Sequence, residues 1–184
     1  MKKQTKMTFA TTNIVLAGLM TAILCIVAPF SFPLPFSPVP ISFATFILYI
    51  NAYVLGYRLG TVTCLLYLLL GLTGIPVFSG FGAGIGKLAG PTGGYLIGYI
   101  FLALIGGFVI EISEGRRLWS ALGLIAGTAV TYAFGTMWLA SQMNLTFMQG
   151  LMAGVIPYLL GDGLKITAAL IIGPILKSRI KHLH

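Results

Sequence analysis

Acidic residues are scarce in this chain of 184 residues, which holds three aspartates and glutamates against eleven lysines and arginines. Charged residues of both signs make up 8% of the sequence, whereas a soluble domain carries about 25%. Such a chain cannot cover a water-facing surface, and this excludes a soluble globular protein. The hydrophobic content of 58% also excludes a disordered chain. We therefore expect an integral membrane protein that forms one membrane domain over residues 1–184.

Residues for catalysis and metal binding are also few. Both histidines, His182 and His184, lie in the terminal tail, and no cluster of Cys, His, Asp and Glu has the spacing of a metal site. The glycine-rich run that ends at Lys87 resembles a phosphate loop, but Leu88 follows the lysine where Ser or Thr is needed. The sequence predicts no enzyme, no cofactor and no nucleotide motor of its own.

The basic residues are spread over the chain ends and short loops, without a basic stripe or a known nucleic-acid motif. We therefore expect the lipid bilayer, and no nucleic acid, as the surroundings of this chain.

Long apolar stretches are abundant. A helix that crosses the bilayer needs about 20 mostly apolar residues in a row. Six stretches qualify, of which the second and third are short and joined by a tight turn between residues 56 and 60. They cover residues 9–28, 42–56, 59–75, 93–110, 118–139 and 147–176. The sequence therefore predicts an all-α fold, an integral membrane bundle of six transmembrane helices.

The positions of the basic residues predict the orientation of this bundle. If the amino terminus is inside, nine of the eleven basic residues fall in inside segments, and the outside loops hold only Lys87. The nine are Lys2, Lys3, Lys6, Arg58, Arg116, Arg117, Lys177, Arg179 and Lys181. Cytoplasmic loops are enriched in Lys and Arg, so we expect a multi-pass protein of the cell membrane with both termini in the cytoplasm.

Two connections on the expected outer side are unusually constrained. Residues 29–40 are rich in proline and phenylalanine, and residues 71–94 are rich in glycine with little polar content. Neither composition is typical of a solvated linker. Apolar loops of restricted shape on one side of a bundle indicate a lid over a cavity.

One acid lies inside a predicted span. Asp162 is followed three residues later by Lys165, and this spacing places both side chains on one face of a helix. Ionisable residues within a membrane are costly and usually face the bundle interior. They predict either a polar floor for a ligand, with Asp162 as acceptor and Lys165 as donor, or a buried ion pair that fixes helix register.

The first apolar stretch carries pairs of small residues four apart, Ala17 with Thr21 and Gly18 with Ala22. Such pairs let helices approach closely in lipid. They predict either internal packing or a face that docks a partner, and the sequence does not decide between the two.

Three sequence features together resemble a known family. They are the stretches Pro76-Val-Phe-Ser-Gly80 and Gly90-Pro-Thr-Gly-Gly-Tyr-Leu96, the proline-rich Pro38-Val-Pro-Ile-Ser-Phe43, and Pro157 followed by Asp162 and Lys165. With them the chain is similar, over nearly its whole length, to the BioY family of biotin-binding S-components of energy-coupling factor (ECF) transporters.

This resemblance implies six membrane helices that bind biotin from the outside, together with a transmembrane coupling subunit and two ATPase subunits. It implies that small residues of the first helix dock on the coupling subunit. Here Ala17, Gly18, Thr21 and Ala22 would have to serve, because a contiguous Ala-x-x-x-Ala is missing.

On the same basis, Asp162 would accept a ureido N–H of biotin and Lys165 would donate to the ureido carbonyl or to the carboxylate. The reach of Lys87 to the ligand is left open. The substrate-binding set predicted in this way comprises Asp162, Lys165, Phe43, Ser79, Phe81, Gly82, Lys87 and Tyr158.

A self-sufficient, proton-coupled secondary transporter of a small carboxylate-bearing solute is the alternative, with Asp162 as the proton site. The sequence lacks visible repeated halves, which many secondary transporters have, and this counts against the alternative.

Overall fold

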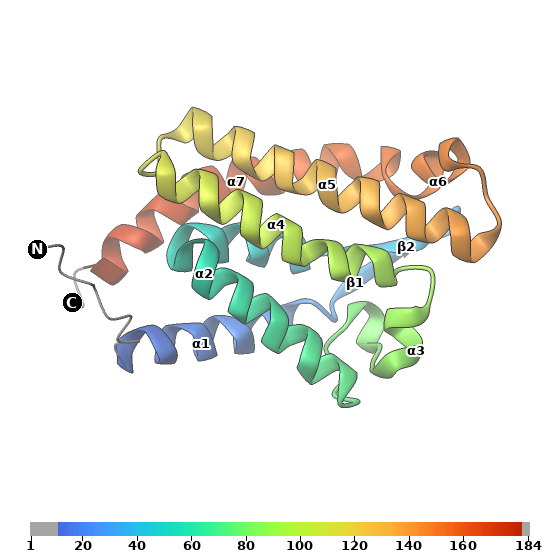
Figure 1. The fold of residues 1–184 in the computed structure, drawn as a ribbon, viewed down its shortest axis with the longest axis horizontal. Helices are drawn as coiled ribbons and strands as arrows, with labels where there is room; N and C mark the ends of the chain where they lie inside the picture. Colours follow the sequence, from blue (N-terminus) through green and yellow to red (C-terminus); the bar gives the residue numbers. More distant parts are fainter. Residues whose placement is uncertain (1–10, 182–184) are drawn as a thin grey trace, which may run out of the picture.

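The computed structural model describes residues 11–181, which are mostly helical (Figure 1). The helices are α1 (Thr11–Val27), α2 (Ala44–Leu72), α3 (Gly84–Ala89), α4 (Gly93–Ile112), α5 (Arg117–Met143), α6 (Phe147–Gly154) and α7 (Leu159–Lys181). Two 3₁₀ turns, η1 (Ser79–Phe81) and η2 (Ile156–Tyr158), and two antiparallel strands, β1 (Ser31–Leu34) and β2 (Ser37–Ser42), complete the described elements.

Four stretches of the described chain are long and apolar enough to cross a membrane: Ala44–Leu72, Gly93–Ile112, Arg117–Met143 and Phe147–Ile180. The helix α1 is also apolar, but it has 17 residues, slightly fewer than the about 20 that a full crossing needs. A mostly helical membrane protein is thus confirmed.

The element α2 contains two of the expected spans. Gly56 interrupts it with a φ of 69° and a ψ of −171°, a conformation in which only glycine is unstrained. A methyl group at Gly60 would lie 3.6 Å from the carbonyl oxygen of Asn51, whereas residues nine apart in a straight helix are separated by about 13 Å. The two halves of α2 therefore fold back side by side, and the tight turn expected after residue 56 is at Gly56 (Figure 1).

Two expectations about regular structure are wrong in part. The stretch 147–176 is not one helix, because α6 ends at Gly154 and α7 begins at Leu159. Pro157 lies in this break; it has no amide hydrogen and disfavours a helical residue before it. The fold is also not purely α-helical, because the proline-rich loop forms the hairpin of β1 and β2. Proline fixes φ near −65°, which suits an extended chain at an edge.

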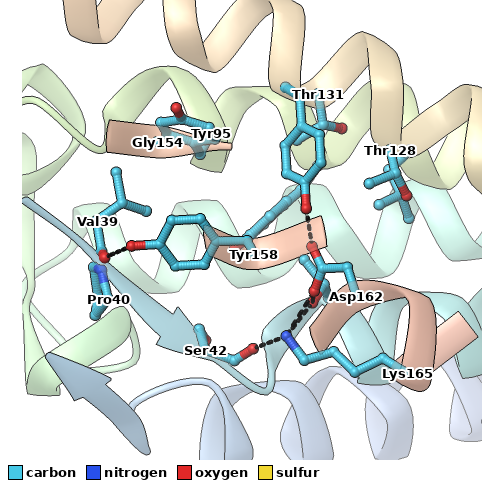
Figure 2. Close-up of a pocket in the computed structure, with 14 residues that line it drawn as sticks. Val39, Pro40, Ser42, Tyr95, Thr128, Thr131, Gly154, Tyr158, Asp162 and Lys165 are labelled. Carbon is cyan, nitrogen blue, oxygen red and sulfur yellow. Dashed lines mark hydrogen bonds and ion pairs between the residues drawn. The ribbon is translucent and has the colours of Figure 1, made fainter. Parts of the chain in front are cut away.

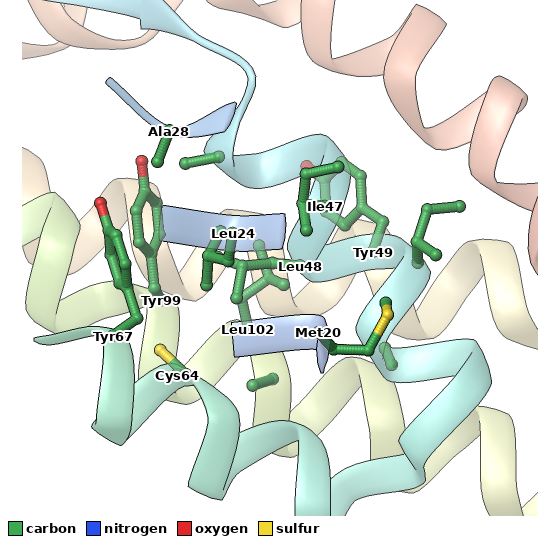
Figure 3. Close-up of a cluster of buried hydrophobic side chains, with 14 of the residues drawn as sticks. Met20, Leu24, Ala28, Ile47, Leu48, Tyr49, Cys64, Tyr67, Tyr99 and Leu102 are labelled. Atoms are coloured by element: carbon green, nitrogen blue, oxygen red, sulfur yellow. The ribbon is translucent and has the colours of Figure 1, made fainter. Parts of the chain in front are cut away.

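The hydrophobic core lies between α1, α2 and α4 (Figure 3). Leu24 of α1, Leu48 of α2 and Leu102 of α4 are fully buried there. Tyr67 adds an edge-on contact with the ring of Phe78, with the two ring centroids 5.5 Å apart. This packing fixes the position of the residues that begin α2 and α4, which also border the pocket described below.

The two ends of the bundle differ in charge. The start of α1, the bend at Gly56, the α4–α5 loop and the end of α7 lie at one end, here called the basic end (Figure 1). Arg58, Arg116, Arg117, Lys177 and Arg179 belong to these segments, while Lys2, Lys3 and Lys6 lie outside the described residues. The hairpin, α3 and α6 lie at the opposite end, here called the hairpin end, which carries Lys87.

Candidate ligand-binding site

A small pocket, with a cavity volume of about 50 Å³, lies within the bundle below the hairpin, where β2, α2, α4, α5 and α7 meet (Figure 2). Its walls combine aromatic rings with hydroxyl groups, and one ion pair borders it. The lining residues are Val39, Pro40, Ser42, Thr45, Tyr95, Tyr99, Leu102, Thr128, Thr131, Tyr132, Gly154, Tyr158, Asp162 and Lys165.

The predicted pair Asp162 and Lys165 forms one wall of this pocket. Lys165 Nζ lies 2.7 Å from Asp162 Oδ1, and the two side chains are 14% and 8% exposed, in that order. Both are on the first turns of α7, directly after the break at Pro157, so the i, i+3 spacing brings them together as expected. The buried ion pair is thus present, and it lies where a ligand can reach it.

Lys165 uses all of its donors within the protein. Besides Asp162, its ammonium group donates to the carbonyl oxygen of Ser42 at 2.7 Å and to Thr45 Oγ1 at 3.1 Å. An ammonium group has three N–H donors, so these three acceptors saturate it. The pair therefore ties α7 to the end of β2 and the start of α2 (Figure 2).

Asp162 keeps a free acceptor position. Its Oδ1 receives Lys165 and, at 3.3 Å, Thr45 Oγ1, while Oδ2 receives the hydroxyl of Tyr132. A carboxylate offers about four lone-pair positions, so one of them, on Oδ2, is not used by any described residue. This oxygen is the acceptor that the site can offer to a ligand N–H.

Three of the partners were not found from the sequence. Ser42, Thr45 and Tyr132 are ordinary polar residues on other elements, far from Asp162 along the chain. Ser42 lies in the proline-rich stretch of the family resemblance, but nothing in the local sequence marks its contact with Lys165, nor those of Thr45 and Tyr132, because these come from the packing of α5 and the hairpin against α7.

Tyr158, which was predicted, connects the pocket to the hairpin. Its hydroxyl donates to the carbonyl oxygen of Val39 and lies 2.7 Å from Ser37 Oγ, which in turn bonds to the carbonyl of Ala153 at 2.7 Å. The turn at Pro157 places Tyr158 on the pocket wall, and the hairpin is held over the pocket by these bonds (Figure 2).

Tyr95 supplies a second unused polar group. It is buried at the start of α4, and its hydroxyl lies against Gly154, where a methyl group would come within 2.0 Å of it. The hydroxyl has no hydrogen-bond partner among the described residues. Buried polar groups are generally paired, and the hydroxyl of Thr136, also buried, is its electrostatic neighbour.

Five predicted residues do not line the pocket in this structure: Phe43, Ser79, Phe81, Gly82 and Lys87. Phe43 precedes α2 and is exposed, with its ring centroid 6.2 Å from that of Phe32. Phe81 is exposed as well, and its ring centroid lies 5.6 Å from that of Phe30. The side chain of Lys87 lies against Gly82.

These residues belong to two loops that contact each other at the hairpin end. The amide of Gly80 donates to the carbonyl of Pro29 at 3.0 Å, which adds to the ring contact between Phe30 and Phe81. A lid over the pocket, built from both loops, stays a prediction.

The two small-residue pairs of α1 lie on different faces. Ala17 and Thr21 are buried, and the Thr21 hydroxyl donates back to the Ala17 carbonyl at 2.7 Å. Gly18 and Ala22 are exposed, and nothing lies within 4 Å of a methyl group placed on Gly18. Internal packing therefore accounts for the first pair, while the second remains available to a partner.

A metal ion has no evident place in the part of the chain that the structure describes, where no group of three His, Cys, Asp or Glu side chains comes together.

Comparisons with known proteins agree with this arrangement. The biotin transporter BioY of Thermotoga maritima is 36% identical over 166 residues, which cover 90% of this chain and 96% of that protein. The probable biotin transporter BioY of Pyrococcus horikoshii is 38% identical over 135 residues, or 73% and 78% of the two chains. A crystal structure of the S-component for biotin from an ECF-type ABC transporter has the same fold, with a TM-score of 0.86, 24% identity and 94% coverage of both chains.

The model of the BioY family matches residues 1–182, nearly the entire chain. With relatives above 30% identity over most of its length, the chain belongs to the BioY family.

Proposed function

We propose that this protein is the substrate-binding S-component of a biotin uptake system, which binds the vitamin from the extracellular side and has no catalytic activity. The names of its relatives support a biotin transporter over a proton-coupled transporter of another solute. The observation that carries the proposal is the buried Asp162, which offers a free acceptor oxygen in a pocket of tyrosines and hydroxyls.

The chemistry of biotin suits this pocket. Its ureido group has two N–H donors and one carbonyl, its fused rings are apolar, and its chain ends in a carboxylate. Ligand sites are typically apolar with a few placed polar groups. In our proposal Asp162 Oδ2 accepts a ureido N–H, and the rings pack against Tyr158.

The saturated donors of Lys165 suggest a division of roles. Lys165 holds Asp162 charged and in place, and it contacts the ligand carbonyl only by sharing a donor. The ligand carboxylate then points toward the hairpin end, where Lys87 has no partner among the described residues. In our proposal the proline-rich and glycine-rich loops close over the pocket when the ligand binds. This closing would bring Lys87, Phe43, Ser79, Phe81 and Gly82 to the ligand.

We propose six membrane crossings: α1, the two halves of α2, α4, α5 and the stretch that ends in α7. The bend at Gly56 divides α2 into two halves, and each half would be one crossing. The arginines and lysines of the basic end support a cytoplasmic location for that end, and hence for both termini of a multi-pass protein of the cell membrane.

Energy for uptake must come from other subunits, because the sequence has no nucleotide-binding loop. We propose a transmembrane coupling subunit and two ATPase subunits as partners. The exposed face of α1 that contains Gly18 and Ala22 is the proposed docking surface, since small residues permit close helix contact in lipid.

Calorimetric titration of the purified protein in detergent tests the binding function. Biotin should bind tightly at one site per chain, and a vitamin of another shape should not bind. Asp162→Asn should weaken binding at least about tenfold, or about 1.4 kcal/mol, because the amide nitrogen cannot accept an N–H. Glu111→Gln, at the basic end, is the matched control and should bind normally.

Absence of binding by a folded protein would refute the proposed ligand. Uptake into liposomes by the isolated chain, driven by a proton gradient, would instead favour the proton-coupled alternative.

A further inference from the structure

A second open groove lies at the basic end, on the side of the α4–α5 loop. It has a volume of about 440 Å³ and is formed by the last turn of α4, the loop and the first turn of α5. Its lining residues are Val109, Ile112, Ser113, Glu114, Arg116 and Trp119. None of these residues lines the biotin pocket.

The groove combines apolar walls with one charge of each sign. Ile112 is 66% exposed and Trp119 is 54% exposed, in helices that are long and apolar enough to cross a membrane. Exposed tryptophans are typical of the boundary between hydrocarbon and headgroups. The groove therefore lies where a bilayer changes from acyl chains to polar groups.

The two charged side chains of the groove are not used within the protein. Glu114 and Arg116 form no ion pair or side-chain hydrogen bond with any other residue that the structure describes. The loop itself is held by backbone bonds, from the Gly115 amide to the Ile110 carbonyl at 2.9 Å and from the Arg116 amide to the Ser113 carbonyl at 3.0 Å.

We propose that this groove binds a phospholipid whose headgroup carries both a phosphate and a primary ammonium, as in phosphatidylethanolamine. Arg116 binds the phosphate, and Glu114 accepts from the ammonium. The acyl chains lie along Val109, Ile112 and Trp119.

The pairing of charges selects among headgroups. A phosphatidylglycerol headgroup has the phosphate without a cation, so Glu114 repels it. A phosphatidylcholine headgroup is zwitterionic, but its quaternary ammonium has no N–H to donate. Of these three headgroups, phosphatidylethanolamine alone offers a phosphate to Arg116 together with an N–H-donating cation to Glu114, and this preference is independent of biotin binding.

Trp119 provides a direct probe, because the chain has two tryptophans and the other is Trp138 near the hairpin end. A Trp138→Phe variant in lipid nanodiscs leaves the fluorescence of Trp119, which phospholipids with brominated chains quench on contact. At equal mole fractions of each brominated lipid, the apparent affinity for the groove obtained from Trp119 quenching should be about threefold higher for phosphatidylethanolamine than for phosphatidylcholine or phosphatidylglycerol. This is the size expected for one exposed charge pair.

Two substitutions assign the contacts. Glu114→Gln should abolish the preference for phosphatidylethanolamine over phosphatidylcholine, and Arg116→Gln should weaken quenching by all three lipids. The matched controls Glu111→Gln and Arg117→Gln remove neighbouring charges that do not line the groove, and they should keep the wild-type order.

Equal quenching by the three lipids would overturn the proposal, and so would a preference for phosphatidylglycerol. If Trp138→Phe does not fold, the difference in quenching between the native protein and Trp119→Phe reports the same preference.

Discussion

The two long contacts made by α5 are built in opposite ways. Toward α4, glycines bring the backbones together: a methyl group at Gly98 would lie 2.8 Å from Thr131 Cγ2, and one at Gly127 would lie 3.1 Å from Leu102 Cα. Toward α7, a groove of about 180 Å³ lies between the helices, and nothing lies within 4 Å of a methyl group on Gly163.

The polar groups follow the same division. On the α4 side, the Thr131 hydroxyl donates to the Gly98 carbonyl at 2.9 Å, within a closed contact. On the α7 side, Thr128, Tyr132 and Asp162 border both the groove and the pocket proposed for biotin. Dense packing thus joins α4 to α5, whereas the side-chain hydrogen bond between α5 and α7 is the one from Tyr132 to Asp162.

The largest effect should come from breaking the polar side. Lys165→Met removes the cation and leaves Asp162 as a buried carboxylate without its counter-ion. Breaking a buried pair in this way costs about 3–5 kcal/mol. Thermal unfolding in detergent should therefore show a strongly destabilised protein.

The double variant Asp162→Asn with Lys165→Met separates charge from packing. It removes both charges and should recover most of the lost stability without recovering biotin binding. Equal stability of the native protein and Lys165→Met would contradict a structural role for the ion pair.

The sequence predicts the parts of this site that depend on local rules. Asp162 and Lys165 are ionisable residues in an apolar stretch, so a single helical spacing brings them together. The bend near residue 56 also follows from a local glycine. The family motif and the apolar spans add the overall helical arrangement.

The remaining parts depend on contacts between distant elements. Tyr132 and Ser42 resemble many other polar residues of this chain until α5 and β2 pack against α7. The predicted loop residues, such as Phe81, lie away from the pocket, because the loop packs on the hairpin through Phe30. Sequence patterns do not specify such loop positions, whereas they do specify which faces of a helix are buried.

A smaller effect should distinguish the two contacts of α5 by the same substitution. Gly98→Ala places a methyl group against Thr131 in the closed contact, and such overpacking costs about 1–3 kcal/mol. Gly163→Ala places the same group in open space and should change the stability by at most about 1 kcal/mol, toward greater stability, since alanine favours the helix. Unfolding temperatures of the two variants, measured side by side, test this contrast, and equal destabilisation would contradict it.

The smallest effect should come from Tyr132→Phe, which removes one hydrogen bond and keeps the ring between the groove and the pocket. Asp162 retains Lys165 and Thr45 on Oδ1, so it stays charged, but its Oδ2 is no longer held toward the pocket. We expect biotin affinity to fall about fivefold, corresponding to about 1 kcal/mol for one net hydrogen bond. Calorimetric titration measures the change, with Tyr57→Phe as the control that should leave biotin affinity unchanged, because the Tyr57 hydroxyl accepts from Arg58 Nε at 2.8 Å and does not line the pocket.

A double-mutant comparison decides whether Tyr132 acts through Asp162. In a protein that already carries Asp162→Asn, the acceptor that Tyr132 positions is altered, so adding Tyr132→Phe should lower the affinity no further. A fully additive loss would mean that the Tyr132 hydroxyl contacts the ligand itself or supports the fold by another route.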